Sequence, residues 1–278
     1  STPTDVAPGT DVTLSWSGAG AGTNNAITGY QVYRSTSAAS GYTTLGNKVV
    51  TTATSGSLTV TSHATNGSSY FYKVATIGTV SGYDSGQSSA YATLKTTVTD
   101  PTAPTTVSTP TNVAPSSTQD LTWSGAAAGT NNAISTYEIH RSTDSGATYS
   151  LLTTDSSSPL PVTAPATNGG IYTYKVKTVG ARSSSGLSSV YATLKTTVGA
   201  PGVPTAVSVA SGSEVAPGKL RTLSWSGASN GTNNPIKGYH VYRSVNGGAY
   251  AYLAEVLTTA TSGSLSVTAA SSAATYTY

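Results

Sequence analysis

The sequence predicts an all-β protein built from three tandem β-sandwich domains, and three observations support this prediction. The 278 residues contain three Trp, and each occupies the same place in a segment that occurs three times. Trp16, Trp123 and Trp225 are 107 and 102 residues apart, which is the length of a domain rather than of a solenoid repeat. Short runs with alternating apolar and polar residues, separated by turn sequences, favour strands over helices.

The repeat divides the chain into domains at residues 1–100, 101–200 and 201–278. Proline-rich stretches at 101–107 and 201–207 join them. Because proline fixes φ, these linkers should be semi-rigid. The first copy has no counterpart of such a stretch, so its first strand should be partly missing. With semi-rigid linkers, the three sandwiches should form an elongated rod.

Alternation places the strands within each copy. In the first copy the alternating segments are 12–16, 30–33, 58–61, 70–76 and 90–94. Their Thr, Val and Tyr residues suit a pleated, half-buried surface, and Asn-Gly and Gly-containing turns separate them. Seven short strands of this kind describe a sandwich. The residues expected to face inward are Trp16, Tyr30, Val32, Tyr72 and Val74.

Composition excludes several functional classes. Charged residues make up 8% of the chain and the net charge is +3, without a Lys/Arg cluster, so no nucleic-acid partner is expected. No apolar run approaches the ~20 residues that a membrane span needs. Cys and Met are both absent, which suits an oxidising exterior because no sulfur is exposed to oxidation. The alternative is loss of two rare residues by drift.

Catalytic and metal-binding patterns are absent from the sequence. The ten Asp and Glu residues share no position across the three copies, and the three His are scattered. A pair of carboxylates for acid–base work, a metal-ligand spacing and a Gly-x-Ser-x-Gly nucleophile motif are all lacking. We therefore expect no enzyme activity in this chain, and no catalytic, cofactor-binding or metal-binding residue.

One motif of apolar and aromatic residues recurs in all three copies. In the first copy the motif residues are Leu14, Trp16, Ile27, Gly29, Tyr30, Val32, Tyr70, Tyr72 and Val74. In the second they are Leu121, Trp123, Ile134, Tyr137, Ile139, Tyr172, Tyr174 and Val176. In the third they are Leu223, Trp225, Ile236, Gly238, Tyr239, Val241, Tyr276 and Tyr278. This motif resembles the fibronectin type III family, of bacterial or phage extracellular type. The resemblance implies an immunoglobulin-like sandwich of a three-stranded and a four-stranded sheet, with the third and sixth strands adjacent.

The resemblance also implies a tyrosine corner, in which the hydroxyls of Tyr70, Tyr172 and Tyr276 bond back to the backbone. The second copy departs from the pattern by having Thr136 in place of glycine. No Arg-Gly-Asp tripeptide occurs, so integrin binding through that motif is not expected. The third copy stops at Tyr278, inside its sixth strand. Either the chain is cut from a longer one or another segment supplies the missing strand.

Cationic and aromatic residues recur on the third and sixth strands and form the candidate binding site. They are Tyr33, Arg34, Lys73, His140, Arg141, Lys175, Tyr242 and Arg243. An exposed aromatic beside a cation can bind a sugar face or an anionic polymer. The competing interpretation is a solvated strand face with local ion pairs, such as Glu138 with Lys175.

An Asn-Asn pair follows each Trp, beginning at Asn24, Asn131 and Asn233. Asn tolerates left-handed backbone conformations, so a structural turn is favoured over a ligand-binding loop. Two glycosylation sequons begin at Asn66 and Asn230. They matter only if the source glycosylates secreted proteins.

The sequence therefore favours a non-enzymatic extracellular spacer array, as a cell-surface filament or a phage virion module such as a tail fibre or capsid decoration. The matching segments 91–98 and 191–198 indicate an interchangeable unit. Its expected partners are other copies or other structural proteins of a surface or virion assembly, with cell-surface polysaccharide as a further candidate. The alternatives are an adhesion or carbohydrate-binding module, or accessory domains of a secreted polysaccharide-degrading enzyme.

Overall fold

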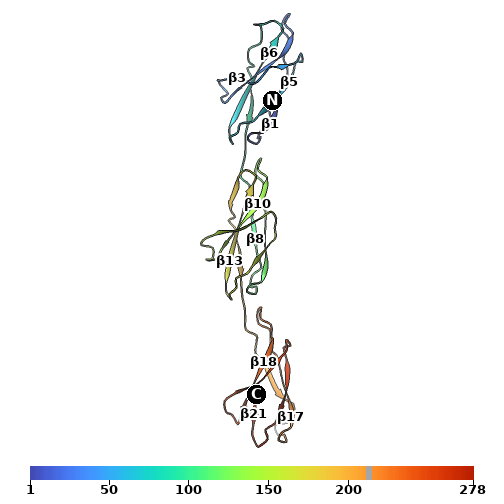
Figure 1. The fold of residues 1–278 in the computed structure, drawn as a ribbon, viewed down its shortest axis with the longest axis vertical. Helices are drawn as coiled ribbons and strands as arrows, with labels where there is room; N and C mark the ends of the chain where they lie inside the picture. Colours follow the sequence, from blue (N-terminus) through green and yellow to red (C-terminus); the bar gives the residue numbers. More distant parts are fainter. Residues whose placement is uncertain (211–214) are drawn as a thin grey trace.

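A computed structural model describes residues 1–210 and 215–278. It is all-β: three sandwiches follow one another along an elongated rod, with the N-terminal domain at the top and the C-terminal domain at the bottom of Figure 1. We call them domain 1, domain 2 and domain 3. Within the described ranges, no helix has the length and apolar character needed to cross a membrane.

Domain 2 has the fullest strand set, with two antiparallel sheets. One sheet has the order β12-β9-β8, and the other has the order β11-β10-β13-β14 with β15 also paired to β13. The strands are β8 (Thr106–Ser108), β9 (Thr118–Ser124), β10 (Ile134–Ser142), β11 (Ser150–Asp155), β12 (Leu160–Thr163), β13 (Ile171–Gly180), β14 (Ser184–Leu187) and β15 (Ala192–Lys195). The adjacency of β10 and β13 is the expected pairing of the third and sixth strands.

Domain 1 has the same larger sheet, in the order β3-β2-β6-β7 with β4 beside β2, but its smaller sheet has only β1 and β5. Its strands are β1 (Asp11–Trp16), β2 (Ile27–Ser35), β3 (Thr43–Thr44), β4 (Val49–Val50), β5 (Gly56–Thr61), β6 (Ser69–Gly78) and β7 (Ala92–Lys95). In domain 2, Val107 of β8 lies opposite Trp123. Domain 1 lacks this strand, and a cavity of about 610 Å³ opens beside Trp16, which is only half-buried.

Domain 3 has a three-stranded sheet β16-β17-β20 and a second sheet β19-β18-β21. Its strands are β16 (Ala206–Val209), β17 (Leu220–Ser226), β18 (Gly238–Val245), β19 (Ala251–Leu257), β20 (Gly263–Thr268) and β21 (Tyr276–Thr277). β21 pairs with β18 only at Ser244 and Val245. The sixth strand is thus two residues long here, against ten in β6 and β13.

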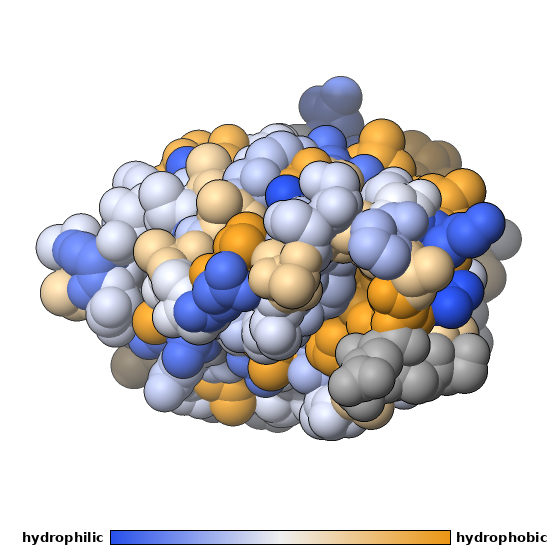
Figure 2. Space-filling model, turned by 90° about the horizontal axis from the view of Figure 1, so that it is seen from below, coloured by the Kyte–Doolittle hydropathy of each residue, from blue (hydrophilic) through white to orange (hydrophobic). Residues whose placement is uncertain are grey.

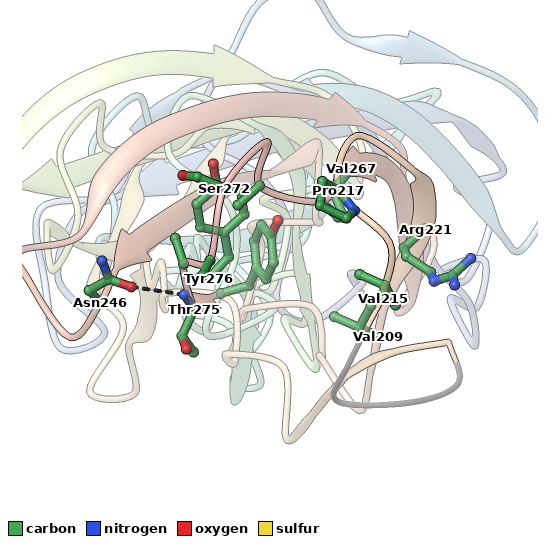
Figure 3. A pocket seen from close by; sticks show the side chains of 14 residues that line it. Val209, Val215, Pro217, Arg221, Asn246, Val267, Ser272, Thr275 and Tyr276 are labelled. Atoms are coloured by element: carbon green, nitrogen blue, oxygen red, sulfur yellow. Dashed lines mark hydrogen bonds between the residues drawn. The ribbon is translucent and has the colours of Figure 1, made fainter.

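A cavity of about 770 Å³ lies at the lower end of domain 3. Its lining includes the apolar residues Val209, Val215 and Val267 and the polar residues Arg221 and Asn246. Figure 3 shows Tyr276 on one side of this cavity, and the Asn246 side chain accepting a bond from the Thr275 backbone NH at 2.8 Å. Seen from below, apolar residues lie exposed among polar ones at this end of the rod (Figure 2).

Each core is built around a Trp and a Tyr in edge-to-face contact. The ring centroids are 5.3 Å apart for Trp16 and Tyr30, and 5.5 Å apart for Trp123 and Tyr137. Tyr30, like Val32 and Tyr72, is fully buried as expected, whereas Trp16 and Val74 are partly buried against the same core. Glycine is required beside the first Trp, because a Cβ on Gly56 would lie 2.6 Å from the Trp16 ring.

The tyrosine-corner expectation is wrong for the described residues. Three tyrosine hydroxyls donate to backbone carbonyls: Tyr30 to Ala53 at 2.7 Å, Tyr239 to Ala260 at 2.8 Å and Tyr42 to Ala38 at 3.1 Å. Tyr30 and Tyr239 belong to the third strand of their domain. The three tyrosines named for the corner instead lie under arginine guanidinium groups, as described below.

Candidate binding face and interdomain joints

The outer face of the larger sheet in domain 1 carries a row of aromatic and cationic side chains. Tyr33 of β2 lies directly opposite Lys73 of β6. Tyr72 pairs with Ala92, so the residue before Ala92, Tyr91, falls beside Lys73 on the same face. Tyr33, Lys73 and Tyr91 thus occupy neighbouring positions on one face of the sheet.

Two further aromatics complete this surface. The Lys73 ammonium lies 4.8 Å from the centroid of the Tyr42 ring, and Phe71 meets Tyr91 edge-to-face at 5.5 Å. Burial raises the pKa of the Tyr42 hydroxyl, and the neighbouring Tyr91 raises it further. We call Tyr33, Tyr42, Phe71, Lys73 and Tyr91 outer cluster 1.

Domain 2 repeats the arrangement. His140 lies opposite Lys175, and the Lys175 ammonium is 5.1 Å from the centroid of the Tyr149 ring. Tyr191 precedes Ala192, the partner of Tyr174, and therefore occupies the place of Tyr91 beside the lysine. We call His140, Tyr149, Lys175 and Tyr191 outer cluster 2.

Domain 3 has aromatic rings but no lysine at this place in the described residues. Tyr242 pairs across the strands with Tyr252, and the two rings meet edge-to-face at 6.0 Å. His240 contacts Tyr252 at 5.7 Å, and Tyr250 is the counterpart of Tyr42 by register. We call His240, Tyr242, Tyr250 and Tyr252 outer cluster 3.

The three arginines of the candidate set do not join these clusters. Alternation along the strand turns each one to the opposite face from the residue before it. Each guanidinium carbon lies over a tyrosine ring of its own domain. The distances to the ring centroids are 4.3 Å for Arg34 and Tyr70, 4.6 Å for Arg141 and Tyr172, and 4.3 Å for Arg243 and Tyr276. Tyr70 and Tyr172 in turn pack against the cores of their domains.

The arginine also faces a buried hydroxyl. Burial raises the pKa of Tyr72 to about 12, and the nearby positive charge of Arg34 acts in the opposite direction. The equivalent Tyr174 is likewise raised to about 12 by burial, opposed by Arg141. Both phenols therefore stay neutral at physiological pH.

The expected ion pair of Glu138 with Lys175 is wrong. The strand register places Lys177 opposite Glu138, and Lys177 Nζ lies 3.2 Å from Glu138 Oε2. His140 Nε2 contacts the same oxygen at 3.2 Å. The hydrogen bond with His140, followed by that from Lys177, lowers the pKa of the Glu138 carboxyl.

The Asn-Asn loops are turns, as expected. Asn24, Asn131 and Asn233 have φ values of 56°, 50° and 50°, which lie in the left-handed region that Asn tolerates. In each loop the second Asn forms a two-way backbone bridge with a glycine three residues earlier. The turn geometry is therefore the same in all three domains.

Two of these loops also hold neighbouring domains together, which the sequence did not indicate. The side-chain amide of Asn131 in domain 2 donates to the Asp5 carbonyl of domain 1 at 2.6 Å. It also donates to the Thr97 carbonyl at 2.9 Å. One side chain thus bridges two carbonyls at the end of the preceding domain.

The second joint repeats the first. Asn233 donates to the carbonyls of Asn112 and Thr197, both at 2.8 Å. Backbone bonds tie each linker to the next domain as well: Thr102 NH donates to the Ala127 carbonyl and Gly202 NH to the Ser229 carbonyl, both at 2.9 Å. The linker is therefore part of the folded structure rather than a free tether.

Glycine makes this close approach feasible. A Cβ on Gly129 would lie 2.0 Å from the Thr99 carbonyl oxygen, and one on Gly231 would lie 2.0 Å from the Gly199 carbonyl oxygen. Gly22, at the same place in domain 1, would contact only its own loop. The joints thus explain why glycine is needed at positions 129 and 231.

A second asparagine holds the segment that immediately precedes each linker, an arrangement we call the clamp. Asn66 donates to the Val98 carbonyl at 2.9 Å and accepts from the Val98 NH at 2.7 Å. Asn168 makes the same pair of bonds with Val198, at 3.2 and 2.7 Å. Asn66 is a sequon asparagine, and a glycan on its amide would break this clamp.

Comparison with known proteins finds similar solved structures but no similar sequence family. No protein-family model and no curated protein matches the chain. The crystal structure of the chicken CNTN1 FN1-FN3 domains is 15% identical over 99% of this chain and 92% of that chain, with a TM-score of 0.34. The FN3tt crystal structure is 24% identical over 36% of this chain and 97% of that chain, with a TM-score of 0.29.

Both TM-scores are low, so the assignment of the fold depends on the strand order of this chain. In domain 2, the first, second and fifth strands form one sheet, and the third, fourth, sixth, seventh and eighth form the other. The fold is fibronectin type III-like. Across the described parts of these fibronectin type III-like domains, no three His, Cys, Asp or Glu side chains are grouped to hold a metal ion.

Proposed function

We propose that this chain is a stiff, non-enzymatic spacer that acts outside the cell. The observation that carries the proposal is the pair of interdomain joints, built twice from the same bonds. Domains joined by a short linker move relative to one another unless contacts restrain them. Here the hydrogen bonds of the two joints provide this restraint.

The joints are strong enough to limit bending. Each combines two side-chain bonds with backbone bonds between linker and loop, and a hydrogen bond contributes about 1 kcal/mol net. Several together exceed thermal energy, about 0.6 kcal/mol, by several fold. The orientation of neighbouring domains should therefore be narrowly distributed.

The extracellular part of the proposal is supported by composition. The chain lacks Cys and Met, so exposure to oxidants damages no sulfur. A stiff rod of interchangeable units suits a cell-surface filament or a phage virion module such as a tail fibre or capsid decoration. On this proposal its partners are other structural proteins of that assembly.

Spin labels can test the stiffness, because the chain has no native cysteine. Labels at Ser57→Cys in domain 1 and Thr163→Cys in domain 2 sit on exposed strand positions. Pulsed EPR should show a narrow distance distribution in the parent chain. The distribution should broaden when Asn131→Ala removes both side-chain bonds of the first joint.

Asn24→Ala is the matched control, since Asn24 has the same turn conformation but contacts no other domain in this structure. It should leave the distribution unchanged. The stiff-spacer proposal fails if the distance distribution of the parent chain is already broad. It also fails if the distribution of the Asn131→Ala variant is as narrow as that of the parent.

A further inference from the structure

We propose that outer clusters 1 and 2 are repeated binding sites for an acidic polysaccharide. This function is separate from the spacer role and does not depend on it. Three features support the proposal: the shape of the clusters, the availability of their lysines, and the retention of the same side chains in two domains.

The first feature is shape. Tyr33 and Tyr91 flank Lys73 on neighbouring strands, so the row is about 10 Å long at a strand spacing of ~4.8 Å. Tyr91 is 49% exposed and Tyr191 is 59% exposed. A row of rings on a sheet can lie under successive sugar rings of an extended glycan, with ring faces meeting the apolar C–H faces of the sugars.

The second feature is charge. In the described residues, no salt bridge joins Lys73 or Lys175 to a carboxylate. Each ammonium instead lies over a tyrosine ring, at 4.8 and 5.1 Å from the ring centroid. By contrast, Lys177 on the same face is bonded to Glu138. The two lysines beside the rings can therefore pair with sugar carboxylates.

The third feature is selective retention between the domains. Tyr42, Lys73 and Tyr91 correspond by register to Tyr149, Lys175 and Tyr191. The neighbouring outward positions differ, since His140 replaces Tyr33 and Thr173 replaces Phe71. The Tyr-Lys-Tyr set is thus kept where the surrounding face has changed.

Two sites on one chain favour a polymeric ligand over a small one. Binding of one cluster raises the effective concentration of the same polymer near the other, and avidity can then exceed either single affinity by about 10²–10⁴. Outer cluster 3 is aromatic but has no lysine in the described residues, so it is not included in the proposal.

The test uses the full chain with polygalacturonate as the acidic polymer and dextran as the neutral one, in affinity gel electrophoresis. The parent should be retarded by polygalacturonate only, and added salt should weaken the retardation because ion pairs are screened. The double variant Tyr91→Ser and Tyr191→Ser should bind at least tenfold more weakly. Melting curves establish that this variant remains folded.

Tyr83→Ser is the matched control, because Tyr83 is 75% exposed and lies outside the clusters. It should bind like the parent. The variant Lys73→Gln and Lys175→Gln should lose binding to the acidic polymer. The proposal is overturned if the parent does not bind polygalacturonate, if it binds dextran equally well, or if the double tyrosine variant binds like the parent.

The spacer and binding proposals can fail independently. A chain carrying Asn131→Ala and Asn233→Ala should still be retarded by polygalacturonate, because both clusters remain intact. Conversely, the double tyrosine variant should keep the narrow EPR distribution of the parent. A loss of binding in the joint variant would contradict the assignment of the site to the outer faces of single domains.

Discussion

Replacing Trp123 by Ala should strongly destabilise domain 2 and leave the stability of domains 1 and 3 unchanged. Trp123 is 6% exposed and meets Tyr137 edge-to-face at 5.5 Å. Val107 of β8 lies opposite it and closes the core on that side. Removal of the indole therefore leaves a large apolar cavity between the two sheets.

The expected cost follows from the area of the ring. A buried aromatic removes about 150–250 Å² from water, which is about 4–6 kcal/mol at 25 cal/mol per Å². Measured Trp→Ala changes in cores fall at about 3–5 kcal/mol. Because a domain of this size is stable by only about 5–10 kcal/mol, the substitution removes most of its stability.

Trp16→Ala offers an internal comparison. Trp16 contacts the equivalent tyrosine, Tyr30, at a centroid distance of 5.3 Å. Trp16 is only half-buried, since domain 1 has no strand in the place of β8. Less apolar area is lost, so we expect a smaller cost, about 2–3 kcal/mol. The ratio of the two losses measures what coverage by β8 contributes.

Calorimetry and denaturant titration would measure both effects. Trp16 and Trp225 are then the only tryptophans left in the Trp123→Ala chain, so its tryptophan fluorescence reports domains 1 and 3 without a contribution from domain 2. The low-temperature transition should belong to domain 2. Three transitions with unchanged midpoints would refute the assignment of Trp123 to the core.

Two further predictions follow from the structure. Burial raises the pKa of Tyr72 and Tyr174 from 10.0 to about 12, so the stabilisation they provide is complete below pH 10 and lost between pH 10 and 12. Each should contribute about 2–3 kcal/mol to alkaline unfolding, and Tyr72→Phe should flatten the pH dependence of domain 1 in denaturant titrations. Gly129→Ala should widen the EPR distance distribution between domains 1 and 2, because its Cβ would overlap the Thr99 carbonyl oxygen, whereas Gly22→Ala should not. Equal distributions in the two glycine variants would contradict the tight packing of the linker.

The sequence by itself determined the repeat and the core. Period-two alternation assigns side chains to one face of a strand or the other, so Tyr30, Val32 and Tyr72 could be placed inside without a structure. The same alternation, applied one residue further, would also have turned Arg34 away from Tyr33. That signal was present in the sequence and sufficient to separate the arginines from the residues of the outer clusters.

The tertiary structure alone decided which residues meet across strands and between domains. The register between two strands depends on loop length and on bulges, such as the one after Ile134. The sequences of the two strands therefore could not show that Glu138 pairs with Lys177 rather than Lys175. The place of Tyr91 beside Lys73 has the same origin. The role of Asn131 could not be predicted from the sequence. Its turn conformation is local, but the two carbonyls that accept its hydrogen bonds belong to another domain. Only the packing of one domain on the next brings them within bonding distance.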